Sequence, residues 1–242
     1  MLTWHIGCSG YHYRHWKGVF YPDKLPQRRW FEFYSQHFQT LELNVTFYRF
    51  PQLSFLETWY EASPADFRFS VKAPRLITHY KQFNNTTQLL TDFYATVQEG
   101  LRDKLGPVLF QLPPRMAYSE DRLNRILDSL DPAFRNVLEF RHSSWWTAEV
   151  YQALANRGVI FCGQSHPLLP DAVVQTTSTG YYRLHGVPEL YKSPYEEDFL
   201  RRLVQEVQEA EVPVQEMYVY FNNDIDASAI GNARQLLALV GQ

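Results

Sequence analysis

Eight short runs with strand character recur along the chain, and most of them are separated by a segment with helical periodicity. The runs span residues 4–9, 40–45, 67–73, 107–113, 136–142, 158–163, 180–186 and 217–223. Strands that alternate with helices form α/β folds with a parallel sheet. Eight such units in 242 residues predict a (β/α)8 barrel of the TIM type, and a doubly wound open sheet is the alternative.

Several of the expected helices carry boundary signals. Ser119 is an N-cap for a helix over 119–130, Gly158 ends one over 147–157, and Ser193 before Pro194 starts one over 194–210. Further helical segments are 27–38, 54–62, 86–105 and 227–240. The exception is the link between strands six and seven, GQSHPLLPDAVVQTTST (residues 163–179), whose prolines predict irregular structure. No linker divides the chain, so we expect a single domain over 1–242.

Composition excludes several classes of protein. No run of about eighteen apolar residues occurs and no signal-peptide pattern opens the sequence, so a cytoplasmic location without membrane contact is expected. Cys8 and Cys162 form no CxxC pair and are expected to be reduced core thiols. The formal charge of −3 argues against coating nucleic acid by general electrostatics. Motifs of nucleotide-binding loops, zincins and serine hydrolases are absent.

Polar side chains recur at the ends of the predicted strands. The reactive face of such a barrel lies at the C-terminal ends of its strands. Side chains two apart share a face, so Glu42 lies with Asn44, Glu139 with Arg141, and Arg183 with His185. We therefore expect a ring of inward-facing polar groups: Ser9, Glu42, Asn44, Lys72, Gln111, Glu139, Arg141, Arg183, His185, Asn222, Asn223 and Asp224.

The order of the motifs also resembles a known family. The runs IGCSGYHYRHWKGVFYP, FQTLELNVTFYRFP, FRFSVKAPRLITH, LGPVLFQLPP, LEFRHSSW, YYRLHG and VYFNND are similar to the YecE-like family of TIM-barrel proteins (domain of unknown function 72). The resemblance implies the barrel and a shared polar site at the ring residues, together with Gly10 and His142. Family members commonly carry an acid after the sixth strand, where this chain reads CGQS.

The ring has two interpretations. It is a network of internal salt bridges, or a site in which Glu42 and Glu139 act as base and electrostatic partner beside Lys72 and Arg141. In the second case, burial raises the pKa of one carboxylate, a cation lowers that of the other, and His185 adds a proton near neutral pH. A barrel that needs only stability fills its axis with Val, Ile and Leu, which favours the site.

The sequence therefore predicts an isomerase, lyase or hydrolase acting on a small anionic or polyhydroxylated ligand such as a sugar phosphate. The expected catalytic residues are Glu42, Lys72, Glu139, Arg141 and His185. The expected substrate-binding residues are Ser9, Asn44, Gln111, Arg183, Asn222, Asn223 and Asp224. No cofactor is implied.

Two alternatives remain for the ring and its loops. Glu42, Glu139, His185 and Asp224 are metal-ligand types, but the three interspersed cations would repel an ion, so no metal is expected. A non-catalytic module would instead bind a nucleotide, a sugar or single-stranded nucleic acid, the last less favoured, through the basic loop from Arg14 to Arg29. Aromatics such as Tyr11, Tyr13 and Trp16 would then stack on the ligand, or else pack in the core.

Overall fold

The eight predicted strands form a closed parallel barrel. The computed structural model describes residues 2–241, and within them each strand pairs with the next while β1 also pairs with β8, which closes the ring. The strands are β1 (Thr3–Ser9), β2 (Thr40–Leu43), β3 (Arg68–Lys72), β4 (Leu105–Gln111), β5 (Asn136–Glu139), β6 (Ile160–Ser165), β7 (Thr179–Leu184) and β8 (Glu216–Phe221). The (β/α)8 prediction is confirmed, and the open sheet is excluded.

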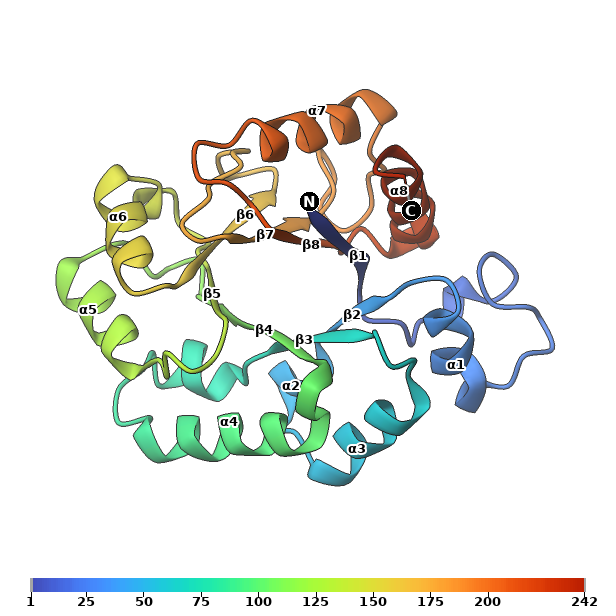
Figure 1. Cartoon of the computed structure of the whole chain (residues 1–242), viewed down its shortest axis with the longest axis horizontal. Helices are drawn as coiled ribbons and strands as arrows, with labels where there is room; N and C mark the ends of the chain where they lie inside the picture. The colour runs from blue at the N-terminus through green and yellow to red at the C-terminus, as the bar shows by residue number, and fades with distance from the viewer. Residues whose placement is uncertain (1, 242) are drawn as a thin grey trace.

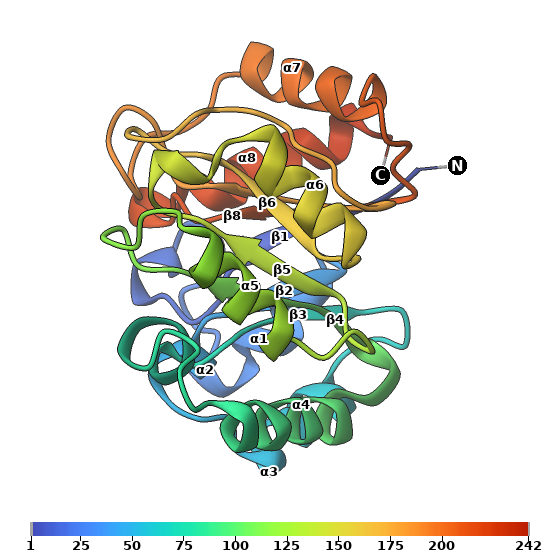
Figure 2. The same ribbon diagram turned by 90° about the vertical axis from the view of Figure 1, so that its left-hand side faces the viewer.

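Helices surround the barrel on the outside (Figure 1; Figure 2). They are α1 (Trp30–Ser35), α2 (Val45–Tyr48), α3 (Leu53–Ala62), α4 (Thr87–Leu101), α5 (Glu120–Ser129), α6 (Ala148–Asn156), α7 (Glu197–Gln208) and α8 (Ser228–Leu239). No helix within 2–241 is long and apolar enough to cross a membrane.

The predicted helix boundaries hold in most places. The Ser119 hydroxyl accepts a hydrogen bond from the Arg122 amide, as its N-cap role requires, and the link after β6 contains no helix. The start of α7 was predicted too early, because the chain enters the helix at Glu197 rather than behind Pro194. The reason is tertiary: both backbone polar groups of buried Tyr195 bond to the Asn232 side chain, which holds this residue outside the helix.

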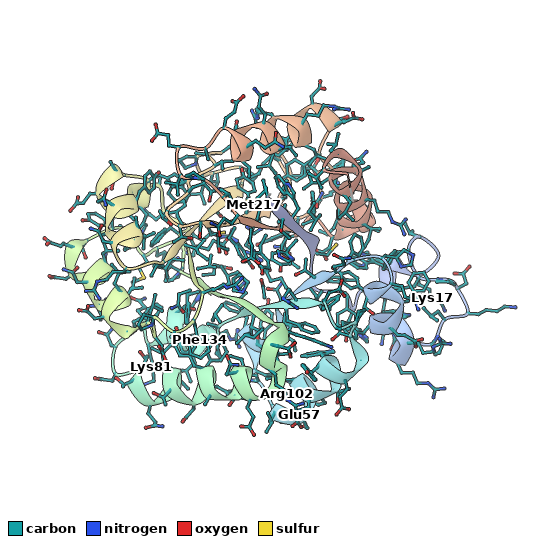
Figure 3. All side chains as sticks on the ribbon, in the orientation of Figure 1. Lys17, Glu57, Lys81, Arg102, Phe134 and Met217 are labelled. Carbon is teal, nitrogen blue, oxygen red and sulfur yellow. The ribbon has the colours of Figure 1, made fainter. Side chains whose placement is uncertain are left out.

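The two faces of each strand differ as predicted. Outward residues such as Leu41, Leu43 and Phe140 belong to the large core beneath the helices. Inward residues form a separate cluster inside the barrel, before the C-terminal ends of the strands: Leu109, Val137, Ile160, Cys162, Tyr181, Tyr218 and Tyr220. Figure 3 shows side chains filling the ring of strands, in agreement with the packed interior expected of such a barrel.

Candidate functional site

A network of charged side chains occupies the C-terminal end of the barrel. Arg183 of β7 is fully buried at its centre. Its Nε and Nη2 donate to the two oxygens of Glu42 at 3.0 and 2.7 Å, and its Nη1 donates to Glu139 Oε2 at 2.8 Å. This guanidinium therefore bridges both buried carboxylates, in a geometry that lysine cannot reproduce.

Each carboxylate of the network has further partners. Glu42 accepts from the hydroxyls of Ser9 (2.5 Å) and Tyr181 (2.6 Å). Glu139 Oε1 lies 2.7 Å from Arg141 Nη2 and 3.0 Å from His185 Nε2. Burial favours the neutral acid, but Arg141 and Arg183 outweigh it and hold the pKa of Glu139 well below its usual range. Glu139 is therefore an anion at neutral pH.

His185 is neutral in this setting. Burial, together with the Arg141 and Arg183 guanidiniums, holds the pKa of His185 well below its ordinary value despite the Glu139 contact. The expected proton on His185 near neutral pH is thus absent. The Asn222 amide nitrogen lies 3.0 Å from Nδ1, while Nε2 lies 3.0 Å from both Glu139 Oε1 and Arg141 Nη2.

Lys72 lies at the end of β3 and is 8% exposed. Among residues 2–241 no carboxylate lies within 4.0 Å of its Nζ, and no hydrogen bond to this nitrogen is formed. The ammonium instead lies 4.3 Å from the centre of the Phe47 ring. Burial and Arg183 lower the pKa of Lys72 to about 7, although Glu139 and Glu42 oppose the shift.

The sequence after β2 explains how Phe47 reaches this lysine. The short helix α2 follows Asn44 directly, and its Thr46 hydroxyl donates to the Lys72 carbonyl at 2.6 Å and lies 2.9 Å from that of Leu43. These contacts fix α2 across the ends of β2 and β3 and place Phe47 over the amine. Cation and ring attract each other here, but the ring accepts no proton.

The first loop closes over the Glu42 side of the network. Gly10 follows β1 with a φ of +97°, and a Cβ there would lie 2.7 Å from the Tyr13 hydroxyl. That hydroxyl donates to the Ser9 carbonyl. Beneath this loop is a cavity of about 320 Å³, lined by residues 10–13, 42–45 and Trp59. The Glu42 side chain itself is fully buried.

Three further predicted residues lie at the edge of this end. Gln111 is paired with Glu139 across β4 and β5, which places it beside the network. Asn44 is half-buried, and its Oδ1 has no partner within the described chain. Asp224 holds the first loop, because its carbonyl oxygen lies 2.6 Å from His15 Nε2; burial raises the pKa of its own carboxyl group.

The structure corrects the placement of Asn223 and decides between the two alternatives for the first-loop aromatics. Asn223 does not face inward: β8 ends at Phe221, and the Asn223 amide donates outward to the Ser193 carbonyl and to Asn232 Oδ1. The first-loop aromatics pack rather than offer open faces, since Trp16 is fully buried and Tyr11 and Tyr13 are half-buried against the core. Lys17 of the basic loop lies beside α1 at the outer edge (Figure 3).

Sequence reasoning missed several neighbours of the network. Tyr181 shares a strand face with Arg183 and His185, so the alternation that predicted those two residues also contained the signal for it. Phe47 carried no such signal, because its position depends on the turn into α2. The rings of His166 and Tyr191 lie edge-on to His185, at 5.8 and 6.1 Å, and come from irregular links.

The arrangement of the network is unfavourable for a metal ion. Within residues 2–241, no three His, Cys, Asp or Glu side chains are grouped to hold one. The carboxylate oxygens of Glu42 and Glu139 already face guanidinium or hydroxyl donors. A metal would have to displace these donors.

Comparison with known proteins supports the fold. A family model described as "Protein of unknown function DUF72" matches residues 5–242. The chain belongs to this family. The resemblance to YecE-like proteins is confirmed: the DUF72 chain is 32% identical over 144 residues to UPF0759 protein YecE of Escherichia coli K12, which covers 59% of the chain. It spans about half of that relative, 53% of its length.

Other relatives match the DUF72 chain over more of its length. UPF0759 protein YunF of Bacillus subtilis strain 168 is 25% identical, covering 91% of this chain and 89% of that protein. A solved DUF72 family protein from Thermotoga maritima MSB8 has a TM-score of 0.90 at 28% identity, covering 99% of this chain and all of that one. A DUF72 family protein from Enterococcus faecalis V583, at a TM-score of 0.81 and 17% identity, supports the fold alone.

Proposed function

We propose that the C-terminal barrel mouth is the active site of a metal-independent enzyme, an isomerase, lyase or hydrolase that moves a proton on a small anionic or polyhydroxylated ligand such as a sugar phosphate. The observation that supports this most is Lys72. A buried ammonium without an ion pair costs stability, and a barrel has no structural need for one at its mouth. Groups with such perturbed protonation concentrate at functional sites.

Lys72 is also the group whose pKa suits proton transfer. At a pKa of about 7 both its protonated and its neutral form are abundant at neutral pH, which is the condition for an efficient general acid or base. Glu139 is held as an anion by two guanidiniums and is a weak base. We therefore assign proton transfer to Lys72, and assign orientation and charge stabilisation to Glu42, Glu139 and Arg183.

Arg141 is the group best suited to hold an anionic substrate. Its side chain is 8% exposed, and one guanidinium edge pairs with Glu139, while its buried Nε has no partner within the described chain. The two carboxylates and two guanidiniums of the network cancel, so a protonated Lys72 gives the mouth a net positive charge. An anion is thus attracted to the same place as the amine.

Calorimetric titration with inorganic phosphate and glycerol 3-phosphate tests this function. We expect binding to the wild type at pH 6 that weakens as the pH rises through about 7, because Lys72 then loses its proton. Lys72→Met should weaken binding by about tenfold or more, whereas Lys81→Met, at an exposed lysine, should leave it unchanged. Equal binding by the wild type and Lys72→Met would contradict the proposal.

A binding module for single-stranded nucleic acid is the second candidate. The observation that favours it is an exposed cluster beside the mouth, in which Arg75 lies 5.6 and 5.5 Å from the ring centres of Tyr48 and Tyr80. Exposed rings beside cations suit base stacking and phosphate contact. Fluorescence anisotropy with a labelled oligonucleotide tests it: salt-sensitive binding lost in Tyr48→Ala but kept in Lys72→Met would favour this module.

A further inference from the structure

Two of the six lysines in the sequence are buried, and they differ in one respect. Nζ of Lys104 donates to the carbonyl oxygens of Tyr60 and Ser63 and to the Ser63 hydroxyl, at 2.6, 2.8 and 2.9 Å. Nζ of Lys72 donates to none of the described residues. The nitrogen is not completely buried, because Lys72 is 8% exposed, and Nζ therefore keeps a small contact with solvent at the mouth.

The groups around the Lys72 amine come from every side of the mouth. Phe47 of α2 covers it, and the charges that act most on its pKa are those of Arg183, Glu139, Glu42 and Arg141. His79, from the turn after β3, has its own pKa lowered by burial and by Lys72. Burial and the guanidiniums favour the neutral amine, and only the neutral amine has the lone pair that attacks carbon.

We propose that Lys72 is a nucleophile that forms a Schiff base with the carbonyl group of a small anionic substrate, an inference that rests on the proposed function and names its substrate class. Two features of the geometry support it. The Lys72 amine, at the C-terminal end of the barrel, forms no hydrogen bond to the described residues, and the nearby Arg141 guanidinium has an Nε without a partner among them.

The chemistry balances without an oxidant or reductant. The Lys72 nitrogen bonds to the carbonyl carbon, the C=O π pair moves to oxygen, and that oxygen takes up the proton that nitrogen loses, which gives a carbinolamine. Protonation of its hydroxyl and loss of water then form the C=N bond of a protonated imine. This cation withdraws electrons from the neighbouring carbon, so that carbon can lose a proton to water or lose a carbon group, as an isomerase or lyase requires. Lys72, bound in the imine at this stage, is not itself the proton acceptor.

The anionic part of the substrate follows from Arg141. Its Nε is buried and unpartnered within residues 2–241, and a guanidinium matches either a carboxylate or a phosphate. The substrate class is thus an aldehyde or ketone that carries one of these anions. Pyruvate and dihydroxyacetone phosphate are probes for the two kinds of anion, and acetone is the uncharged control.

Reductive trapping tests the proposal on the wild-type protein. The protein is incubated at pH 7 with each probe and sodium cyanoborohydride, digested, and mapped by mass spectrometry. Only about 0.04% of a lysine with the ordinary pKa of ~10.4 is neutral at this pH. The adduct on Lys72 should therefore exceed that on the exposed lysines Lys17, Lys24, Lys81 and Lys192 by about tenfold or more. Lys104 should stay unmodified, and acetone should give less adduct than either anion.

The outcomes separate this inference from the proposed function. Adducts spread over the surface lysines with Lys72 unmodified would overturn the Schiff base. If glycerol 3-phosphate, which has no carbonyl group, still binds in a Lys72-dependent manner, the proposed function stands without it. If neither binding nor an adduct at Lys72 occurs, both are wrong. Lys72→Arg keeps the charge, and should bind phosphate but form no adduct.

Discussion

The two buried lysines lie at opposite ends of the barrel and face the same physical problem. Lys104 precedes β4, at the N-terminal end of the strands, and is 6% exposed; Lys72 ends β3, at the other end, and is 8% exposed. Burial lowers the pKa of each. Lys104 has three oxygen partners besides the Tyr60 ring, whereas Lys72 has the Phe47 ring alone among the described residues. Under the proposed function, this unequal compensation at equal burial corresponds to a structural role for Lys104 and a functional role for Lys72.

A shortage of acceptors at the mouth does not explain the difference. The carboxylates of Glu42 and Glu139 are available at this end of the barrel as acceptors. Their oxygens, however, contact other groups than Lys72: Arg183, Arg141, His185 and the hydroxyls of Ser9 and Tyr181. Within the described residues, Arg141 is paired at one edge of its guanidinium, whereas Arg183 is fully paired and Lys72 is unpaired. We expect substitution of Arg183 and of Lys72 to have opposite effects on stability.

The largest effect is expected for Arg183→Met. This change leaves two buried carboxylates facing each other without the guanidinium, and breaking such a pair costs about 3–5 kcal/mol in the free energy of unfolding. Urea denaturation measures it, and Arg183→Lys should recover only part of the loss, because one ammonium cannot bridge both carboxylates. A loss below about 1 kcal/mol for Arg183→Met would show that this network is not structural.

A smaller loss is expected for Lys104→Met. The carbonyl oxygens of Tyr60 and Ser63 lose their lysine donor, at about 1–3 kcal/mol in total. The matched control is Lys81→Met, at an exposed lysine, which should change stability by less than about 0.5 kcal/mol. If the two variants unfold at the same urea concentration, the structural role of Lys104 is wrong.

Lys72→Met should stabilise the protein, by an amount that is largest below pH 7 and declines as the pH rises toward about 10. The folded-state pKa of about 7 lies below the ~10.4 of an unfolded lysine. The stability cost is therefore fully present below pH 7 and is lost as the pH rises through about 10. At pH 6 the variant should be more stable by roughly 1–3 kcal/mol, since the lost Phe47 contact offsets part of the gain. A variant less stable than wild type at pH 6 contradicts this sign.

The smallest effect is expected from a chelator. Guanidinium and hydroxyl donors occupy the carboxylate oxygens of the network, so EDTA should leave phosphate binding unchanged in calorimetry. Binding that is lost with EDTA and restored by a divalent ion would require a different arrangement of the mouth.

The parts of the molecule that depend on local pattern were predictable from sequence. Strand alternation placed Glu42 inside and Leu41 outside, and the same rule grouped Arg183 with His185. Grouping polar residues by strand end, without following the alternation further, produced the error at Asn223. Turn geometry, which positions Phe47, has no periodic signal.

The protonation states were not predictable, because they depend on tertiary neighbours. Nothing in the local sequence distinguishes Lys104, in the run LRDKLGP, from Lys72, in FSVKAP, as paired and unpaired. His185 was expected to take up a proton, but Arg141 and Arg183 surround it and lower its pKa. Adding up the charges of residues in the sequence does not show which charged side chains contact each other in the folded protein.

Direct titration of the lysines tests the central claim that Lys72 is a neutral-range amine. With 13C-labelled lysine side chains, the Cε resonance reports protonation of each amine, and Lys72→Arg identifies its signal by loss. The account predicts that this resonance titrates near pH 7, well below the ~10.4 of a lysine in an unfolded peptide. A Lys72 resonance that titrates together with the exposed lysines would contradict it.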